Sequence, residues 1–399
     1  MHIMRYLAVL CLVATPVQGD DYPAATVRVY PVSRDQGQSV FSGMVAHPNG
    51  KVYMGTCNQD GRFAHLVELD PQSGTVRNVA DMQVVTGQYD AEMIPQSKIH
   101  TQIVVDKWGR LWFGTWAEEF RSRSYPKGYP GGYLISYDPA TDQCTNHGIL
   151  FPQLVERPKS VSEHGGYLIA IAINAGKDTL YILTGDTVRL VVYDIVTGKH
   201  FTAGEVPTTG HLHYAIRDLE VAADGNVYLF DTFGQLRRYV PASRKIEPLK
   251  IWIPGSNGKS ANVPYQMAID PTGTRIYGSG SGTCGLFELL VEHGKPPRIK
   301  DLGPSFDKAA RPVNPQICGM TVGLNGVLYY GPGGGATLYG YEPTRGKFHI
   351  GQLQTTNQAQ KVFANYVGAA CTSPDGTIYL GGSFKLSQQN SLCFIKYTP

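Results

Sequence analysis

The sequence predicts an all-β fold made of many short antiparallel strands. Only 17% of the 399 residues are charged, whereas glycine (46), proline (26) and tyrosine (24) are abundant. Turn formers and aromatic residues in this proportion are typical of short strands joined by tight turns. At 42% hydrophobic residues the chain can bury a large core, which excludes general disorder. A net charge of +3 does not indicate a nucleic acid or a membrane as the partner.

A tight turn followed by a strand recurs seven times, and no helical period accompanies it. Apolar and aromatic residues alternate at period two between these turns and a second, hairpin pattern such as Val67-Glu-Leu-Asp-Pro-Gln-Ser-Gly. Each unit of about fifty residues therefore predicts four antiparallel strands. Such units stack radially to bury both faces, so the sequence predicts a seven-bladed β-propeller of four-stranded antiparallel blades. The turn glycines are Gly50, Gly109, Gly176, Gly225, Gly273, Gly326 and Gly376.

The N-terminal residues predict a signal and a closing strand. Arg5, the apolar run 6–15 and the small residues near Gly19 are typical of a secretory signal peptide over residues 1–19, and a buried strand is the alternative. We therefore expect a secreted, extracellular protein. Residues 20–399 predict one propeller domain, with no membrane partner and a monomeric state. After Gly376 only two strands remain, so the strand 24–30 is expected to close the ring as the missing outer strand.

Six cysteines lie outside the predicted signal. An even number permits disulfides in an oxidising compartment, and six buried free thiols are an equally fair interpretation. The spacing contains no Cys-x-x-Cys, so neither a zinc knuckle nor a redox motif is indicated. No cofactor is predicted, and a structural or catalytic divalent metal stays an open alternative. The six are Cys57, Cys144, Cys284, Cys318, Cys371 and Cys393.

The topology of a propeller predicts which face carries function. Inner strands start at one face, where the loops between second and third strands also open, and the repeated turns belong to the opposite face. Histidine, tyrosine, arginine, glutamine and tryptophan around such a funnel suit an anionic sugar, because aromatic rings stack on the sugar and cations meet its carboxylate. The candidates at this face are His100, Trp116, Tyr167, His213, Tyr214, Arg217, Tyr265, Gln266 and Gln316.

Each candidate has a structural alternative. His100 could bond the backbone of a neighbouring blade, and Tyr167 could pack between blades. Arg217 could form an ion pair with Asp218 or Glu220 lower in the channel. Trp116 could be a surface-loop aromatic. His211 and His213 alternate along one segment, so at most one of them is expected to face the channel.

Three segments resemble a known group of enzymes. The run 98–115, which begins Lys98-Ile-His100-Thr-Gln, and the runs 129–139 and 166–172 are similar to blades of the seven-bladed propeller polysaccharide lyases. The ulvan lyases and oligogalacturonate lyase belong to this group. A secreted chain of this length looks most like the L-rhamnose-α-1,4-D-glucuronate lyases, which trim terminal rhamnose from gum arabic.

The resemblance implies β-elimination at a 4-substituted uronate in a polysaccharide or oligosaccharide. Such an enzyme neutralises the carboxylate, removes the C5 proton and assists the leaving O4 oxygen. The resemblance implies that His100 and Tyr167 move protons and that Arg217, or alternatively Arg189, meets the carboxylate. Where a second family histidine is expected, this chain has Trp116. Either His213 or His164 then takes that role, or Trp116 stacks on the sugar.

Two other functions share the predicted fold. A propeller hydrolase or lactonase needs a metal held by acidic residues at the funnel floor, and the sequence shows no such acidic ring. A non-catalytic secreted propeller that binds glycans or proteins has every fold-level feature. Only Glu118, Glu119 and Glu163 occupy positions for hydrolysis by two carboxylates, which is poorly supported. The nucleophile-elbow, zinc-protease and P-loop motifs are absent from the sequence.

Overall fold

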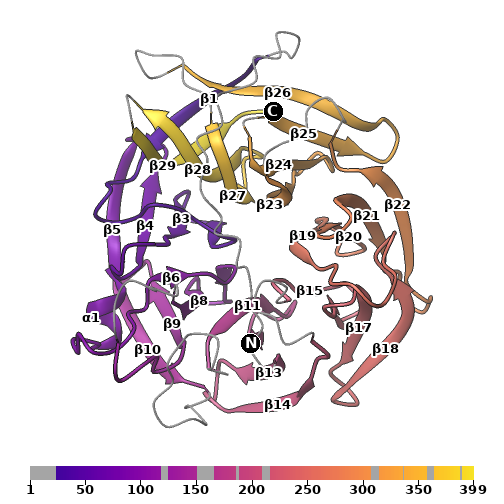
Figure 1. The fold of residues 1–399 in the computed structure, drawn as a ribbon, viewed down its shortest axis with the longest axis horizontal. Helices are drawn as coiled ribbons and strands as arrows, with labels where there is room; N and C mark the ends of the chain where they lie inside the picture. Colours follow the sequence, from indigo (N-terminus) through magenta and orange to yellow (C-terminus); the bar gives the residue numbers. More distant parts are fainter. Residues whose placement is uncertain are drawn as a thin grey trace, which may run out of the picture.

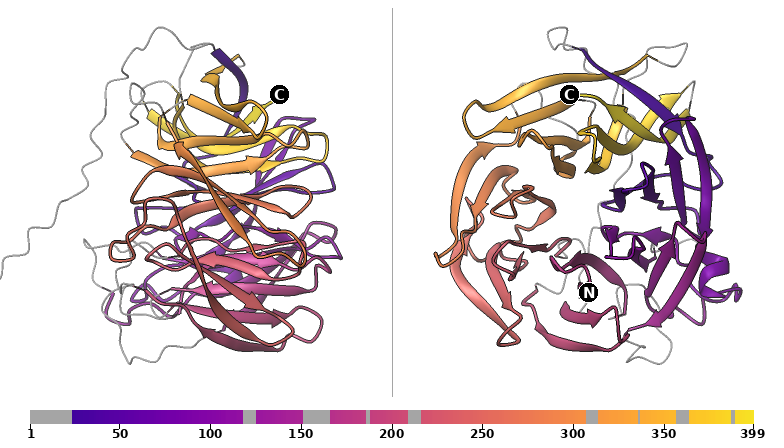
Figure 2. Two further views of the ribbon diagram at one scale, coloured as in Figure 1. Left: turned by 90° about the vertical axis from the view of Figure 1, so that its right-hand side faces the viewer. Right: turned by 180° about the vertical axis from the view of Figure 1, so that it is seen from behind.

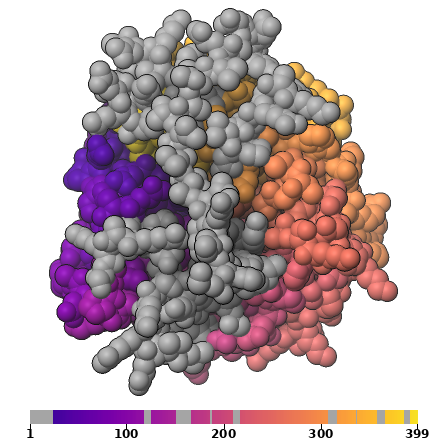
Figure 3. Space-filling model, in the orientation of Figure 1, coloured from indigo at the N-terminus to yellow at the C-terminus, as the bar shows by residue number. Residues whose placement is uncertain are grey.

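The computed structural model describes residues 24–117, 125–150, 166–185, 188–208, 216–306, 314–335, 337–356, 364–386 and 389–399. Its strands form a ring of sheets (Figure 1), which confirms the predicted all-β propeller. Figure 2 shows the same ring from the side and from behind. In the space-filling view the N-terminal blades and the orange blades lie on opposite sides of the molecule (Figure 3). The predicted signal peptide, residues 1–19, lies outside the described residues.

The described strands divide into seven blades, in agreement with the seven repeats. Blade 1 contains β2 (Met44–Ala46), β3 (Val52–Gly55), β4 (His65–Asp70) and β5 (Thr75–Asp81). In blade 2, β6 (Lys98–Ile99) and β7 (Val104–Val105) both pair with β8 (Leu111–Trp116), followed by β9 (Tyr133–Asp138) and β10 (Gln143–Ile149). Blade 3 contains β11 (Leu168–Ile173), β12 (Thr179–Thr184), β13 (Arg189–Asp194) and β14 (His200–Glu205).

The remaining blades follow the same order from the inside of the ring outwards. Blade 4 contains β15 (Glu220–Val221), β16 (Val227–Phe230), β17 (Gln235–Val240) and β18 (Lys245–Trp252). Blade 5 contains β19 (Pro264–Ile269), β20 (Arg275–Gly280), β21 (Gly285–Leu290) and β22 (Arg298–Pro304). Blade 6 contains β23 (Asn314–Val322), β24 (Leu328–Gly334), β25 (Thr337–Glu342) and β26 (Gly346–Thr355). Blade 7 contains β27 (Ala364–Thr372), β28 (Ile378–Leu386) and β29 (Gln389–Tyr397).

The N-terminal strand β1 (Ala24–Pro31) closes the ring, as the sequence predicts. Its second half pairs antiparallel with β29, where Tyr30 lies opposite Phe394. Its first half also pairs in parallel with β26, where Val27 lies opposite Thr355. Blades 6 and 7 therefore share β1 in one eight-stranded sheet, a link that the alternating pattern of the strand does not predict.

The repeated turns explain the strand boundaries. Six of the seven turn glycines have positive φ, a conformation that L side chains adopt at a cost. In the third repeat the left-handed residue is Lys177 (φ 51°), so this turn is shifted by one position from Gly176. The buried residues of each strand pack between adjacent blades, in clusters that together line the whole ring.

One detail of the structure was not predicted from the sequence, and a second decides between two predictions for the cysteines. A short helix α1 (Met82–Thr86) follows β5, capped by the side chain of Asp81 and by Gly87. Five residues are too few to produce a helical period, so the pattern did not predict it. Among the described residues, the six cysteines form no disulfide with one another, which decides against the predicted alternative of a disulfide framework. Within the described ranges, the structure contains no helix with the length and apolar character needed to cross a membrane.

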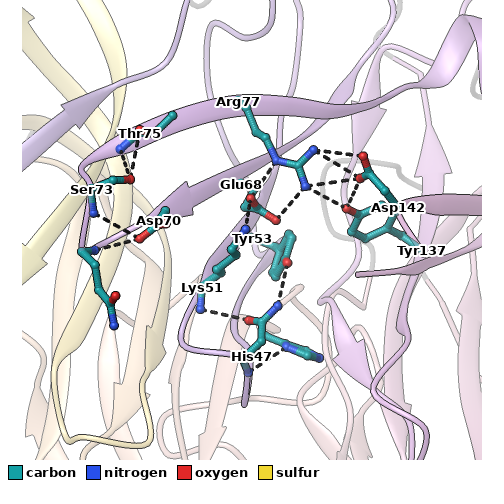
Figure 4. A network of polar contacts seen from close by, with 12 residues as sticks. His47, Lys51, Tyr53, Glu68, Asp70, Ser73, Thr75, Arg77, Tyr137 and Asp142 are labelled. Carbon is teal, nitrogen blue, oxygen red and sulfur yellow. Dashed lines mark hydrogen bonds and ion pairs between the residues drawn. The ribbon is translucent and has the colours of Figure 1, made fainter. Parts of the chain in front are cut away.

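A polar network joins the outer parts of blades 1 and 2 (Figure 4). The carboxylate of Glu68, 2% exposed, accepts hydrogen bonds from Lys51 Nζ and Arg77 Nε, both at 2.8 Å. Arg77 also reaches Asp142 of blade 2 at 3.2 Å, and the hydroxyl of Tyr137 donates to the same carboxylate. Burial acts to raise the pKa of Glu68, but the hydrogen bonds from Arg77 and Lys51 outweigh burial and lower it below 4.5.

We expect Arg77→Met to lower the free energy of unfolding by about 1–3 kcal/mol, because it removes a charged donor from a buried carboxylate. Since the pKa of Glu68 is lowered in the folded state, this contribution is present above pH 4.5 and is lost as the pH falls through the folded-state value. Denaturant titrations at neutral and acidic pH measure both effects. Arg298→Met, which removes a well-exposed partner of Glu292, is the control and should change stability by less than about 0.5 kcal/mol. Equal stability of Arg77→Met and the wild type at neutral pH would contradict the expectation.

Candidate functional site

Five rings form a continuous row where blades 7, 1, 2 and 3 meet the predicted functional face. The contacts run from Tyr366 to Phe41 (5.7 Å between centroids), to His100 (5.8 Å), to Trp116 (4.5 Å) and to Tyr167 (4.5 Å). Phe41 and Tyr167 precede the inner strands β2 and β11, and Tyr366 lies near the start of β27. His100 lies between β6 and β7, and Trp116 ends β8. We call these five residues the aromatic row. Phe41 was not among the candidates from sequence, because no motif marks its position. Tyr366 does belong to the set that the sequence places at this face, as a residue at the start of the inner strand of blade 7.

His100 is a buried, neutral histidine in the middle of the row. Its side chain is 2% exposed, and its Nδ1 atom has no hydrogen-bond partner among the residues that the structure describes. Burial lowers its pKa well below 6.5, and the charges of Arg217 and Lys98 lower it further, while a hydrogen bond to the backbone of Ile169 acts in the opposite direction. A neutral imidazole with an unused nitrogen can accept a proton from a bound molecule.

Trp116 and Tyr167 stack flat on one another next to His100. Their rings are 5° from parallel, and Tyr167 is completely buried. A Cβ atom at Gly185 would lie 1.7 Å from the Tyr167 ring, so the absence of a side chain there makes room for the tyrosine. This placement agrees with the alternative that Tyr167 packs between blades, where its ring stacks against that of Trp116. The indole Nε1 of Trp116 is buried and has no hydrogen-bond partner within the described ranges.

Lys98 brings a positive charge into the row. Its side chain is nearly buried, at 8% exposure, and its Nζ atom lies 4.9 Å from the Trp116 ring centroid and 5.5 Å from that of Phe41. Cation–π contacts contribute up to about 2 kcal/mol. Removing an ammonium group from water costs several kcal/mol, and the two rings offset part of this cost. Although the Lys98-Ile-His100 motif contains it, Lys98 was not among the binding residues proposed from sequence.

Arg217 carries the second charge and lies just before β15, the inner strand of blade 4. Its guanidinium stacks on the ring of Tyr265 in blade 5, with 4.3 Å between Cζ and the centroid. Its Nε atom is buried and has no hydrogen-bond partner in the described part of the chain. Its charge influences the pKa of groups from blades 2, 6 and 7, namely His100, Cys318 and Tyr366. The positive charge of Arg217 therefore acts on the side chains of three other blades.

The ion-pair alternative for Arg217 is not what the described part of the chain shows. There, neither Asp218 nor Glu220 forms an ion pair with Arg217. The carboxylate of Asp218 instead accepts the backbone N–H groups of Met267 at 2.6 Å and Leu219 at 2.8 Å. Burial raises the pKa of Asp218 to about 7. Asp218 thus fixes the strand that holds Arg217 by bonding blade 4 to blade 5.

Glutamines make similar bonds between other blades. The side chain of Gln266, 5% exposed, accepts the backbone N–H of Met320 at 3.1 Å and so joins blade 5 to blade 6. Gln102 of blade 2 accepts the N–H of Ile171 in blade 3 and donates to the carbonyl oxygen of Arg217 at 3.3 Å. These bonds give Gln266 a structural explanation that the sequence did not offer.

The other candidates are more widely distributed. Gln316 lies at the start of β23 and is partly exposed. Arg189 starts β13 and pairs with Glu205 of the same blade at 3.4 Å, so the structure does not bring it to His100. His213, Tyr214 and His164 lie outside the described residues. In the parts of the chain that are described, no three or more histidine, cysteine or acidic side chains are grouped so that they could hold a metal ion.

Comparisons with known proteins support the fold, but the match to a protein family covers only a short stretch of the sequence. Residues 93–117 match the family described as two component regulator propeller, and this stretch contains Lys98, His100 and Trp116. No curated protein matches the sequence. Because the family match covers a small part of the chain, the similar solved structures carry the comparison further.

Three similar structures illustrate the range of proteins with this fold. The extracellular domain of a protein described as a hybrid two component system from B. thetaiotaomicron is 16% identical, with a TM-score of 0.57 over 92% of this chain and 39% of that one. A catalytically inactive virginiamycin B lyase from Staphylococcus aureus with quinupristin is 10% identical, with a TM-score of 0.57 over 94% and 99%. The Cps50 (Swd1) β-propeller domain of Myceliophteria thermophila is 11% identical, with a TM-score of 0.59 over 94% and 100%.

The fold is a β-propeller. Identities this low establish the fold and leave the activity to the site itself. The similar structures include an extracellular domain and a lyase.

Proposed function

We propose that this protein is a secreted polysaccharide lyase that cleaves the bond to O4 of a uronate by β-elimination. One observation carries the proposal: among the described residues, buried polar atoms of His100, Trp116 and Arg217 have no hydrogen-bond partner. Buried polar atoms are almost always bonded, and His100 contacts the Trp116 ring and is affected by the charge of Arg217, so these three atoms favour a ligand that completes them. A base, an aromatic surface and a cation are the groups that a uronate requires.

The reaction assigns one task to each group. Arg217 meets the carboxylate and makes the C5 proton more acidic, and His100 accepts that proton. The C4–O4 bond then breaks, a C4–C5 double bond forms, and the leaving oxygen takes a proton from water or a nearby hydroxyl group. Because the charge of Arg217 lowers the pKa of His100, a bound carboxylate that offsets this charge raises it again. The substrate thereby strengthens the base that attacks it.

The resemblance of residues 98–115 to propeller lyases supports the substrate class. It favours release of L-rhamnose from rhamnosyl-α-1,4-glucuronate, as in gum arabic. That a propeller of the same fold is a lyase is compatible with elimination chemistry on this scaffold. In this proposal, the protein acts outside the cell as a monomer.

Incubation with uronate polysaccharides, including gum arabic, tests this function. The expected result is ultraviolet absorbance from an unsaturated uronate together with released rhamnose. Reducing sugar without that absorbance would indicate hydrolysis, and the absence of both from every uronate substrate would overturn the proposal. Treatment with a chelator before the assay separately tests the open metal alternative.

A binding propeller without catalysis is the second candidate. The match of residues 93–117 to the two component regulator propeller favours it, together with the near-complete burial of His100 and Trp116. Calorimetry with oligouronates distinguishes the two, because a binding module gives saturable heat and leaves the oligosaccharide intact.

A further inference from the structure

Gln102 lies two residues after His100, on the inner segment of blade 2. The side chain of His100 forms a hydrogen bond with the backbone of Ile169. The side-chain oxygen of Gln102 accepts the backbone N–H of Ile171 at 3.1 Å. Both isoleucines belong to β11, so the segment that carries the proposed base is fixed against blade 3 at two positions. This arrangement leaves the amino group of Gln102 to contact another blade.

The amino group of Gln102 reaches blade 4, beyond the neighbouring blade. It donates to the carbonyl oxygen of Arg217 at 3.3 Å. Burial raises the pKa of Asp218 to about 7, and a hydrogen bond from Gln102 is among the contacts that act in the opposite direction. Asp218 in turn accepts the backbone N–H of Met267 in blade 5 at 2.6 Å. The backbone from which the guanidinium extends is therefore held by bonds to blade 2 on one side and to blade 5 on the other.

We propose that Gln102 is a positioning residue that sets the separation between the imidazole of His100 and the guanidinium of Arg217. The inference rests on the proposed function for the tasks of these two groups, a base and the cation that meets the carboxylate. They come from blades 2 and 4, and Gln102 and Arg217 are 115 residues apart in the sequence. One amide thus links the two segments that carry the proposed chemistry.

The separation matters because both groups must act on one sugar ring. The guanidinium has to meet the carboxylate while the imidazole lies within hydrogen-bond reach of the C5 proton. A misplacement of about 1 Å costs on the order of 100-fold in rate. The guanidinium also stacks on Tyr265, but stacking restricts movement along the ring less than directional hydrogen bonds do. The bonds from Gln102 therefore supply the lateral restraint.

Gln102→Met tests the inference, because methionine has a similar length and makes neither bond. Crystal structures, melting curves and steady-state kinetics of the wild type and the variant are compared. We expect the separation of His100 and Arg217 to change by about 1 Å or more, and kcat for uronate elimination to fall by about 10- to 100-fold. An unchanged separation would overturn the inference, and so would wild-type kcat in the variant of an active enzyme.

The double variant with Arg217→Met distinguishes positioning from a general loss of packing. If Gln102 acts through Arg217, its substitution should change kcat/KM by less than about twofold once the guanidinium has been removed. A loss by the same factor in both backgrounds would show that Gln102 acts on something other than Arg217, and it would overturn the inference.

Gln235→Met is the matched control. Gln235 is also partly buried, and it also uses both ends of its amide. Its amino group donates to the carbonyl oxygen of Leu249 at 2.9 Å, and its oxygen accepts from Arg237 at 3.0 Å. These bonds lie on β17 and β18, the outer strands of blade 4. This variant should keep the wild-type kcat and the wild-type separation of the two groups.

The structural comparison separates this inference from the proposed function. If the wild type eliminates no uronate, the lyase function fails, whereas the role of Gln102 is decided by whether the separation of His100 and Arg217 changes. If Gln102→Met does not fold, as judged by its melting curve, Gln102→Asn takes its place. Its amide is one methylene group shorter and cannot hold the bonds to Ile171 and Arg217 together, so the same change in separation is expected.

Discussion

His100→Gln should lower kcat for uronate elimination by roughly 10²- to 10⁴-fold, the contribution expected of a general base. Glutamine has a similar size and polarity but cannot accept a proton at neutral pH. Because His100 is already neutral in the folded protein, the substitution removes no stabilising charge. The melting temperature should therefore stay close to that of the wild type, and substrate affinity should change much less than kcat. Steady-state kinetics and a thermal melt check both points.

His147→Gln is the matched control for this experiment. His147 is also a neutral histidine on a tryptophan, stacked on Trp112 at 4.4 Å, and burial lowers its pKa to about 4. It lies on β10, in the outer part of blade 2. We expect this variant to keep full activity. Wild-type turnover in His100→Gln would remove His100 from the mechanism.

Arg217→Met should lower kcat/KM by roughly 10²- to 10³-fold, because it removes the charge that meets the carboxylate. It should also move the acid limb of the pH profile. The positive charge of Arg217 holds the pKa of His100 down, so its removal lets this pKa rise. Since the base acts only when deprotonated, activity should disappear at a higher pH than in the wild type. A pH series of kcat/KM measures the shift.

Arg345→Met controls for the loss of an arginine stacked on a ring, because Arg345 lies 3.8 Å from the ring of Phe348 on the outer part of blade 6. It should leave the profile unchanged. Arg189→Met decides between the two arginines that the sequence left open. Loss of activity in Arg189→Met but not in Arg217→Met would reverse the assignment, and an acid limb that stays in place in Arg217→Met would contradict the coupling to His100.

The architecture was accessible from the sequence because its signals are local. A turn glycine such as Gly326 and the alternation after it lie within a few residues of each other, and the same pattern occurs seven times. The strand at 24–30 could be assigned because a four-stranded unit lacked one member. Its second partner, β26, could not, because parallel pairing at Val27 depends on where blade 6 ends in space. The third turn shows a similar limit on a smaller scale. Its residue with positive φ is Lys177 and not Gly176, and the sequence pattern does not distinguish these adjacent positions.

The candidate site was accessible only in part, because it depends on contacts between distant segments. The motif around His100 and the end of β8 pointed to the region where the aromatic row lies. The burial of Tyr167 depends on Gly185 and Trp116, and no local pattern connects these three positions. From its position in the sequence, Gln266 was predicted to bind substrate. Its bond to the backbone of Met320 joins two blades, and no local pattern indicates such a contact between distant segments. Side chains that bond blade to blade and side chains that bind sugars are of the same types, so composition cannot separate them.

The double pairing of β1 has a consequence for how the protein is made. β1 is synthesised long before β26 and β29, the strands with which it pairs, and it cannot take its place between blades 6 and 7 until both have been made. At about 5–20 residues per second, the ribosome makes β29 roughly 20 to 80 seconds after β1. During that interval both edges of β1 lack their partners and can pair with another chain. Crowded synthesis should therefore favour exchange of β1 between copies, in which the first strand of one molecule completes the ring of its neighbour.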